Sequence, residues 1–189
     1  MKLCKTLAAV ALGLGIVSSA HAGLVGVKTI EIKNAIVQWL QVAEVNAFNM
    51  ANFDVASSGN AVASAPDIWD GVNSIPANAI DGVTGGNWVL NQIYHEGNDF
   101  SHDTLTITLN AVQELMSFQI FGRTDCCSVR DVYDITFKDA SGGTIFFIDD
   151  LDATNARHSA SVSFIPEPAS LALLGLGLAG LGFSRRRKA

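Results

Sequence analysis

The chain is poor in charged side chains, and basic residues are the scarcer kind. Aspartate and glutamate number 18 against 12 lysines and arginines, which gives a formal net charge of −6, and charged residues make up only 16% of the sequence. No cluster of lysine or arginine occurs between residues 23 and 164. A nucleic-acid-binding surface needs clustered basic residues. The composition of this central region therefore excludes nucleic acid as a partner.

Patterns typical of several other protein classes are also missing. Residues 23–164 show no internal repeat, no heptads and no convincing amphipathic helix, and they contain no HExxH, phosphate-binding loop or Ser-His-Asp order. Asp149, Asp150 and Asp152 form an acidic group. Glycosidase carboxylates flank a bond across a cleft at roughly 5–9.5 Å, whereas neighbours on a strand point to opposite faces. We therefore expect a protein that is not an enzyme.

The first 22 residues have the features of a secretory signal peptide. Lys2 and Lys5 precede an apolar run over residues 7–17, and the small-x-small pattern of a signal-peptidase site ends at Ala22. The apolar run is too short for a retained membrane anchor. Cleavage after Ala22 also removes Cys4, so only Cys126 and Cys127 remain, in an oxidising compartment where they are free to pair.

The last part of the chain, residues 165–189, has a second targeting pattern. Pro166, Glu167 and Pro168 are followed by an uncharged, glycine-containing run over 169–183 and a basic cluster at 185–188. A helix over 169–183 is roughly 22 Å long, and a bilayer core is about 30 Å thick. The expected short transmembrane helix must therefore borrow flanking residues, and its basic end stays on the cytoplasmic side.

This order of tripeptide, short apolar helix and basic tail resembles the PEP-CTERM sorting signal of Gram-negative bacteria. The resemblance implies recognition of the tripeptide by an exosortase, which cuts off the tail, after anchoring of the precursor in the inner membrane. It also implies a final location at the cell surface or in an exopolysaccharide matrix. An ordinary C-terminal membrane anchor is the alternative.

The central region, residues 23–164, reads as a single all-β domain. Apolar and polar residues alternate, or β-branched and aromatic residues gather, in short stretches separated by Asn-Ala, Ser-Gly-Gly and Asp-Gly clusters. The pattern is weaker over residues 50–98, where we expect long loops with a short strand or helical turn. Many short strands with turn signals predict a β-sandwich. The expected strands cover 27–32, 40–48, 104–109, 115–121, 132–137, 144–148 and 159–164.

Three stretches in this region resemble a discoidin-type domain (F5/8 type C, galactose-binding-like). They are the early strand WLQVAEV at 39–45, the turn AIDG at 79–82 followed by Trp88, and the paired strands at 104–109 and 116–122. The resemblance implies a jelly-roll β-sandwich whose loops at one edge bind a ligand.

Within that superfamily, the stretch RTDCCSVR at 123–130 resembles the F-type, fucose-binding lectins. Members carry a histidine, then Arg-x-Asp, often Cys-Cys, and a further basic residue. His95 departs by one residue from the usual spacing, which a loop accommodates easily, and His102 is the alternative. The resemblance implies that His95, Arg123 and Arg130 bind the sugar and that Asp125 holds the arginines. It also implies that a Cys126–Cys127 disulfide forms an apolar ledge for the sugar.

These residue types suit a monosaccharide, because arginine offers five donors in a rigid fork and forms charge-assisted hydrogen bonds with hydroxyls. Simpler interpretations stay open. Arg123 and Asp125 form a surface ion pair, the two cysteines stay reduced and half-buried, and His95 is a solvated loop residue.

F-type lectins usually hold calcium, but this chain departs from their pattern. The loop at 81–87 lacks the expected second carboxylate, and no late Cys-Glu pair precedes the C-terminal tail. Asn78, Asp81 and backbone carbonyls are the available ligands, whereas calcium takes six to eight oxygens. A role for Asp81 as a turn acceptor is favoured, and no cofactor is required.

The sequence therefore predicts an exported, non-catalytic protein that binds a fucose-like monosaccharide or an exopolysaccharide. The alternative is a structural or adhesive discoidin-like module that binds protein or lipid, with residues 50–98 supplying the contact surface.

Overall fold

The computed structural model describes residues 23–97 and 103–164, which lie in one compact unit, residues 22–167. The signal peptide with its Ala22 cleavage site, His102, the Pro166-Glu167-Pro168 motif and the helix expected over 169–183 fall outside the described residues. Within the two described stretches, no helix has the length and apolar character needed to cross a membrane.

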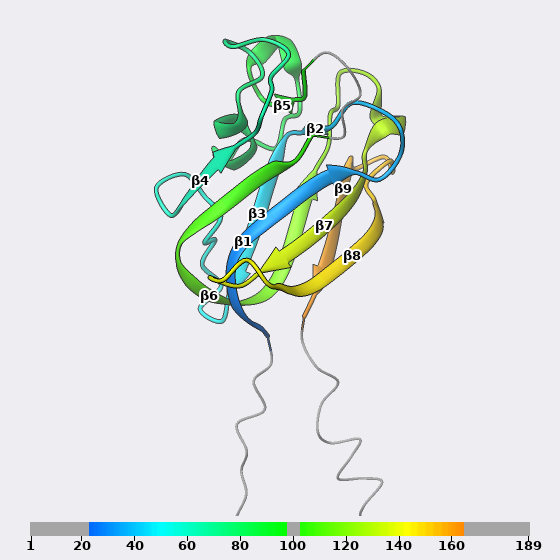
Figure 1. The fold of residues 1–189 in the computed structure, drawn as a ribbon. Coiled ribbons are helices and arrows are strands. Elements are labelled where there is room, and N and C mark those ends of the chain that lie inside the picture. Colours follow the sequence, from blue (N-terminus) through cyan, green and yellow to red (C-terminus); the bar gives the residue numbers. More distant parts are fainter. Residues whose placement is uncertain (1–22, 98–102, 165–189) are drawn as a thin grey trace, which may run out of the picture. The chain divides into compact units, whose positions relative to one another are not determined.

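The described residues form strands joined by loops and by short 3-10 helices (Figure 1). This composition confirms the prediction of an all-β domain. The strands are β1 (Leu24–Asn34), β2 (Gln41–Val42), β3 (Glu44–Asn49), β4 (Ala61–Ser64), β5 (Tyr94–His95), β6 (Leu105–Phe121), β7 (Val132–Lys138), β8 (Thr144–Asp152) and β9 (Ser159–Ser163), and the 3-10 helices are η1 (Pro76–Ile80), η2 (Trp88–Leu90) and η3 (Ser128–Arg130).

The central element is β6, a single strand of 17 residues. The sequence predicted two strands here, 104–109 and 115–121, with a break at the Asn-Ala pair Asn110 and Ala111. That break is absent, because these residues continue the strand with exposed side chains. Irregular register in the facing strand β1, between Val25 and Thr29, lies opposite the middle of β6. Such irregularities bend a pair of strands without ending it.

The two halves of β6 belong to two parts of the sheet. The first half pairs with β4 on one side and β1 on the other, and β1 continues into β7 and β8. The second half lies between β3 and β9. Figure 1 shows β1 and β7 on one side of the domain with β3 and β9 behind them.

Apolar side chains, which alternate with polar ones along the strands, fill the space between these two parts of the sheet. Leu105, Ile107 and Leu109 are fully buried, as their alternation with threonine predicts. Phe118 of the second half of β6 meets Phe137 of β7 edge to face, with ring centroids 5.4 Å apart. Because β6 and β7 do not pair, this contact joins the two parts across the core.

Residues 50–97 contain little regular structure, as the sequence predicts, with only β4, β5 and two 3-10 turns. The short strand β5 pairs antiparallel with β2, which places His95 opposite Gln41. Figure 1 shows β2 and β5 at one end of the sheet, together with much of this loop-rich segment. The pairing brings the predicted histidine to the end where the candidate site lies.

Candidate functional site

A cavity of about 310 Å³ opens among the loops. Its lining combines apolar indole rings with cationic side chains from segments far apart in the sequence. Three of the predicted site residues, His95, Arg123 and Arg130, contribute to it. All three tryptophans of the chain line it as well. The lining residues are Trp39, Trp69, Trp88, His95, Arg123 and Arg130.

His95 lines this pocket and is only 6% exposed. Its Nδ1 lies 2.7 Å from the Glu96 carbonyl oxygen, so Nδ1 carries the proton and Nε2 is the acceptor nitrogen. Its ring centroid lies 6.2 Å from that of Trp39 and 5.6 Å from that of Trp69. Burial lowers the pKa of His95, and the charges of Arg123 and Arg130 lower it further. The imidazole is therefore neutral near pH 7.

The carboxylate of Asp125 holds the guanidinium of Arg123 through two hydrogen bonds. Its Nε donates to Asp125 Oδ1 at 2.6 Å and its Nη2 to Asp125 Oδ2 at 3.2 Å, while Nη1 reaches Gln41 Oε1 at 3.3 Å. The hydrogen bonds from Arg123 are the main cause of the lowered pKa of Asp125. The guanidinium carbon lies 5.8 Å from the ring centroid of Trp88. Asp125 thus holds Arg123 from outside the pocket lining.

Arg130 has a different environment. Its guanidinium carbon lies 4.8 Å from the ring centroid of Trp39, a cation–π distance. The Asn34 amide donates to the Arg130 carbonyl at 2.7 Å, which fixes the backbone of η3. No side chain in the described part of the molecule pairs with the Arg130 guanidinium. Its charge acts on the buried carboxyl of Asp131, whose pKa burial nevertheless raises to about 7, so that carboxyl balances the charge only in part.

A disulfide joins Cys126 and Cys127 immediately before η3. Cys127 is in the left-handed region with a φ of 61° and forms the N-terminal cap of η3. Neither cysteine is among the lining residues of the pocket. The position suits a turn that directs Arg130, and the ledge expected from the resemblance stays a prediction.

Asp131 contacts the backbone of Arg123, and no pattern in the sequence pointed to it. Its Oδ2 accepts from the Arg123 backbone N–H at 3.0 Å, and the side chain is fully buried. Burial raises the pKa of Asp131 to about 7. Trp39 and Trp69 were likewise not predicted as site residues. A signal was available, because tryptophan is enriched at interfaces, where one end of its side chain is apolar and the other is wet.

The residues considered for calcium have other partners. The amide of Asn78 donates to the Asn73 carbonyl at 3.1 Å and to the Ile93 carbonyl at 3.0 Å. Asp81 accepts from the Val83 N–H at 2.8 Å, which is the favoured turn role. Calcium binding at Asn78 and Asp81 stays a prediction.

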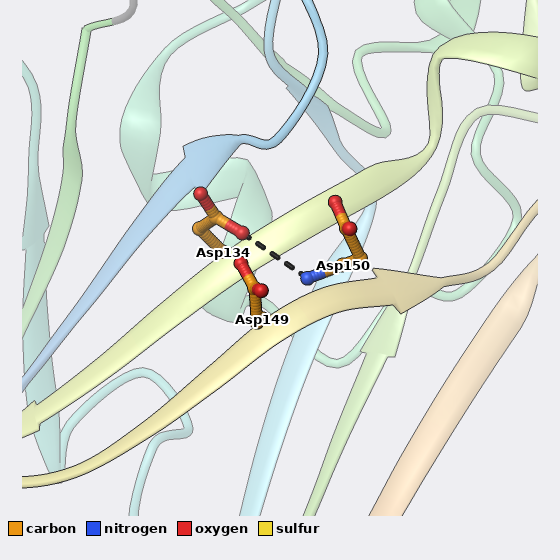
Figure 2. Close-up of side chains that lie close together, drawn as sticks. All are labelled: Asp134, Asp149 and Asp150. Carbon is orange, nitrogen blue, oxygen red and sulfur yellow. Dashed lines mark hydrogen bonds between the residues drawn. The ribbon is translucent and has the colours of Figure 1, made fainter.

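A group of acidic side chains lies on β7 and β8, and none of its members lines the pocket among the described residues. Asp134 on β7 and Asp149 and Asp150 on β8 each place an oxygen within 4.8 Å of the others. Figure 2 shows the three side chains close together on these two strands. Asp152 instead accepts from the Thr154 N–H at 2.8 Å. The arrangement is an open surface, not the flanked cleft that a glycosidase uses. The absence of catalysis stays a prediction.

The comparisons with known proteins bear on the C-terminal segment. No curated protein and no solved structure matches the chain. Residues 164–188 match the family model of the PEP-CTERM protein-sorting motif, which confirms the predicted sorting signal. The chain is accordingly an exported protein that carries an exosortase-processed PEP-CTERM sorting motif.

Proposed function

We propose that the central domain is a non-catalytic carbohydrate-binding module and that the pocket is its sugar site. The observation that carries this proposal is the convergence of three indole rings with His95, Arg123 and Arg130 in one cavity. Aromatic faces pack against the C–H faces of a sugar, and guanidinium groups donate charge-assisted hydrogen bonds to its oxygens. The cavity supplies both kinds of contact at the scale of one monosaccharide.

A discoidin-like jelly roll of the F-type lectin kind is the fold assignment that accompanies this function. Two of the stretches that resemble the family contact each other. Glu44, in the early strand, accepts from the Gly82 N–H of the Ala-Ile-Asp-Gly turn at 3.0 Å through its Oε2. This hydrogen bond supports the resemblance, because it joins the two stretches directly in the fold.

Replacing Arg130 with alanine should remove sugar binding while the fold survives. A hydrogen bond to a charged group contributes about 1.5–3 kcal/mol, so we expect affinity to fall at least tenfold. Retention of the purified exported protein on fucose and on polysaccharide resins measures the effect. Arg157→Ala, at an exposed position, is the matched control and should bind as the parent does. Unchanged retention of the Arg130 variant would reject this pocket as the site.

Reducing the Cys126–Cys127 disulfide should weaken the same binding. Non-glycine residues in the left-handed region cost of order 1–3 kcal/mol and are held there by their surroundings, and Cys127 precedes the turn that carries Arg130. We expect roughly a tenfold loss of affinity, equivalent to about 1.4 kcal/mol. Titrations with and without reductant measure it, and the Arg130→Ala variant should show no further loss. Equal affinity in both redox states would contradict this role for the disulfide.

The alternative function, adhesion to protein or lipid, also has an observation in its favour. Exposed apolar side chains lie within three positions in sequence of lining residues. A blank glycan array together with binding to liposomes or to a captured protein would favour this alternative. These side chains are Ile36, Val37, Val72, Val89, Leu90 and Val129.

A further inference from the structure

Among the described residues, the side chains that line the pocket offer hydrogen-bond donors and almost no acceptors. Indole and guanidinium groups only donate, and they account for every lining residue except His95. The Nε2 atom of His95 is the one side-chain acceptor among the lining residues of the described chain. A carboxylate or side-chain amide is absent from that lining.

This donor excess disfavours a purely neutral sugar. Each sugar hydroxyl carries a proton that needs an acceptor, and a buried donor without one costs about 1–3 kcal/mol. A carboxylate brings only acceptor oxygens.

The charges of the two arginines also favour an anionic ligand over a neutral one. Asp125 neutralises Arg123 through two hydrogen bonds. The guanidinium of the half-buried Arg130 lies over Trp39, and the nearby carboxyl of Asp131 is buried with its pKa raised to about 7, so it neutralises Arg130 only in part. The pocket therefore holds a positive charge that is only partly balanced, in a partly desolvated position where an anion gains most.

Size and apolar lining limit the class of anion. About 310 Å³ is at the small end of the roughly 300–1,000 Å³ that ligand pockets occupy. One sugar unit fits this space. Inorganic anions would leave three indole faces without an apolar contact.

We propose that the pocket selects a hexuronate unit of an acidic polysaccharide, whose carboxylate pairs with Arg130 and whose C–H face packs on the tryptophans. This inference rests on the proposed carbohydrate-binding function and names its substrate class. Substrate recognition then depends mainly on a charge that a neutral hexose lacks.

Calorimetric titration of the exported protein with matched sugars tests the inference. The probes are the methyl glycosides of glucuronate and galacturonate, the corresponding neutral glucosides and galactosides, the uronate methyl esters, and methyl fucoside. We expect each uronate to bind at least tenfold more tightly than its neutral counterpart and its ester. The preference should shrink with added salt and disappear in Arg130→Gln, remain in part in Arg130→Lys, and persist in Arg157→Gln.

The outcomes separate the two proposals. Equal affinity for uronates and neutral sugars would overturn the selection of charge and leave the sugar site in place. Inhibition by acetate as strong as that by a uronate would overturn the sugar part of the inference. Absence of binding to every glycoside, fucoside included, would overturn the proposed function and this inference together.

Discussion

Replacing Phe118 with alanine should lower the free energy of unfolding by about 3–5 kcal/mol. The Phe118 side chain is 0% exposed. Its ring packs edge to face on Phe137, and Phe137 in turn packs on Phe164 with ring centroids 5.3 Å apart. Truncation removes buried apolar area and leaves a cavity where the two parts of the sheet meet. Guanidinium chloride unfolding of the purified protein measures the loss.

Phe147→Ala on β8 is the matched control, because the same atoms are removed from a side chain that is 48% exposed. We expect its effect to stay within about 1 kcal/mol. Comparable losses for the two variants would contradict the assignment of the Phe118 and Phe137 contact as the joint between the two parts of the sheet.

Most of the strands could be predicted because their signal is local. Alternation over 104–109 reports directly that one face is buried, and Leu105, Ile107 and Leu109 are buried. The continuity of β6 through Asn110 could not be predicted in the same way. Whether an Asn-Ala pair turns the chain or extends a strand depends on neighbouring strands, here the pairing with β1. That information is long-range and leaves no local pattern.

The candidate site likewise has one part that a local sequence pattern predicts and another part that depends on long-range contacts. The segment 123–130 has an unusual local composition, so the sequence singled out Arg123 and Arg130. The aromatic part of the pocket is assembled by pairing of β2 with β5 and by the loops over 50–97, which brings Trp39 beside Trp69 with centroids 6.0 Å apart. Asp131 likewise becomes recognisable only through its contact with the Arg123 backbone. These contacts could not be predicted from the sequence, because no short motif includes both partners.

Replacing Glu44 with glutamine should make the domain less sensitive to pH. The Glu44 side chain is 0% exposed, and burial, followed by the charges of Asp81 and Asp54, raises its pKa from 4.5 to about 7. The folded protein therefore keeps a proton between pH 4.5 and 7 that the unfolded chain releases. The resulting stability is fully present below pH 4.5 and is lost as the pH rises through 7. The raised pKa of Asp131 acts in the same direction, and the lowered pKa of His95 opposes both.

For Glu44→Gln we expect a gain of about 2–3 kcal/mol in the free energy of unfolding at pH 8, because each pKa unit corresponds to about 1.4 kcal/mol. The glutamine carbonyl can still accept from the Gly82 N–H. Near pH 4.5 the variant and the parent should have similar stability, which makes that arm the internal control. Denaturant unfolding at pH 4.5, 6 and 8 measures both proteins. A parent whose stability does not fall between pH 4.5 and 8 relative to the variant would show that Glu44 is already ionised in the fold, held by Gly82 and Asn46.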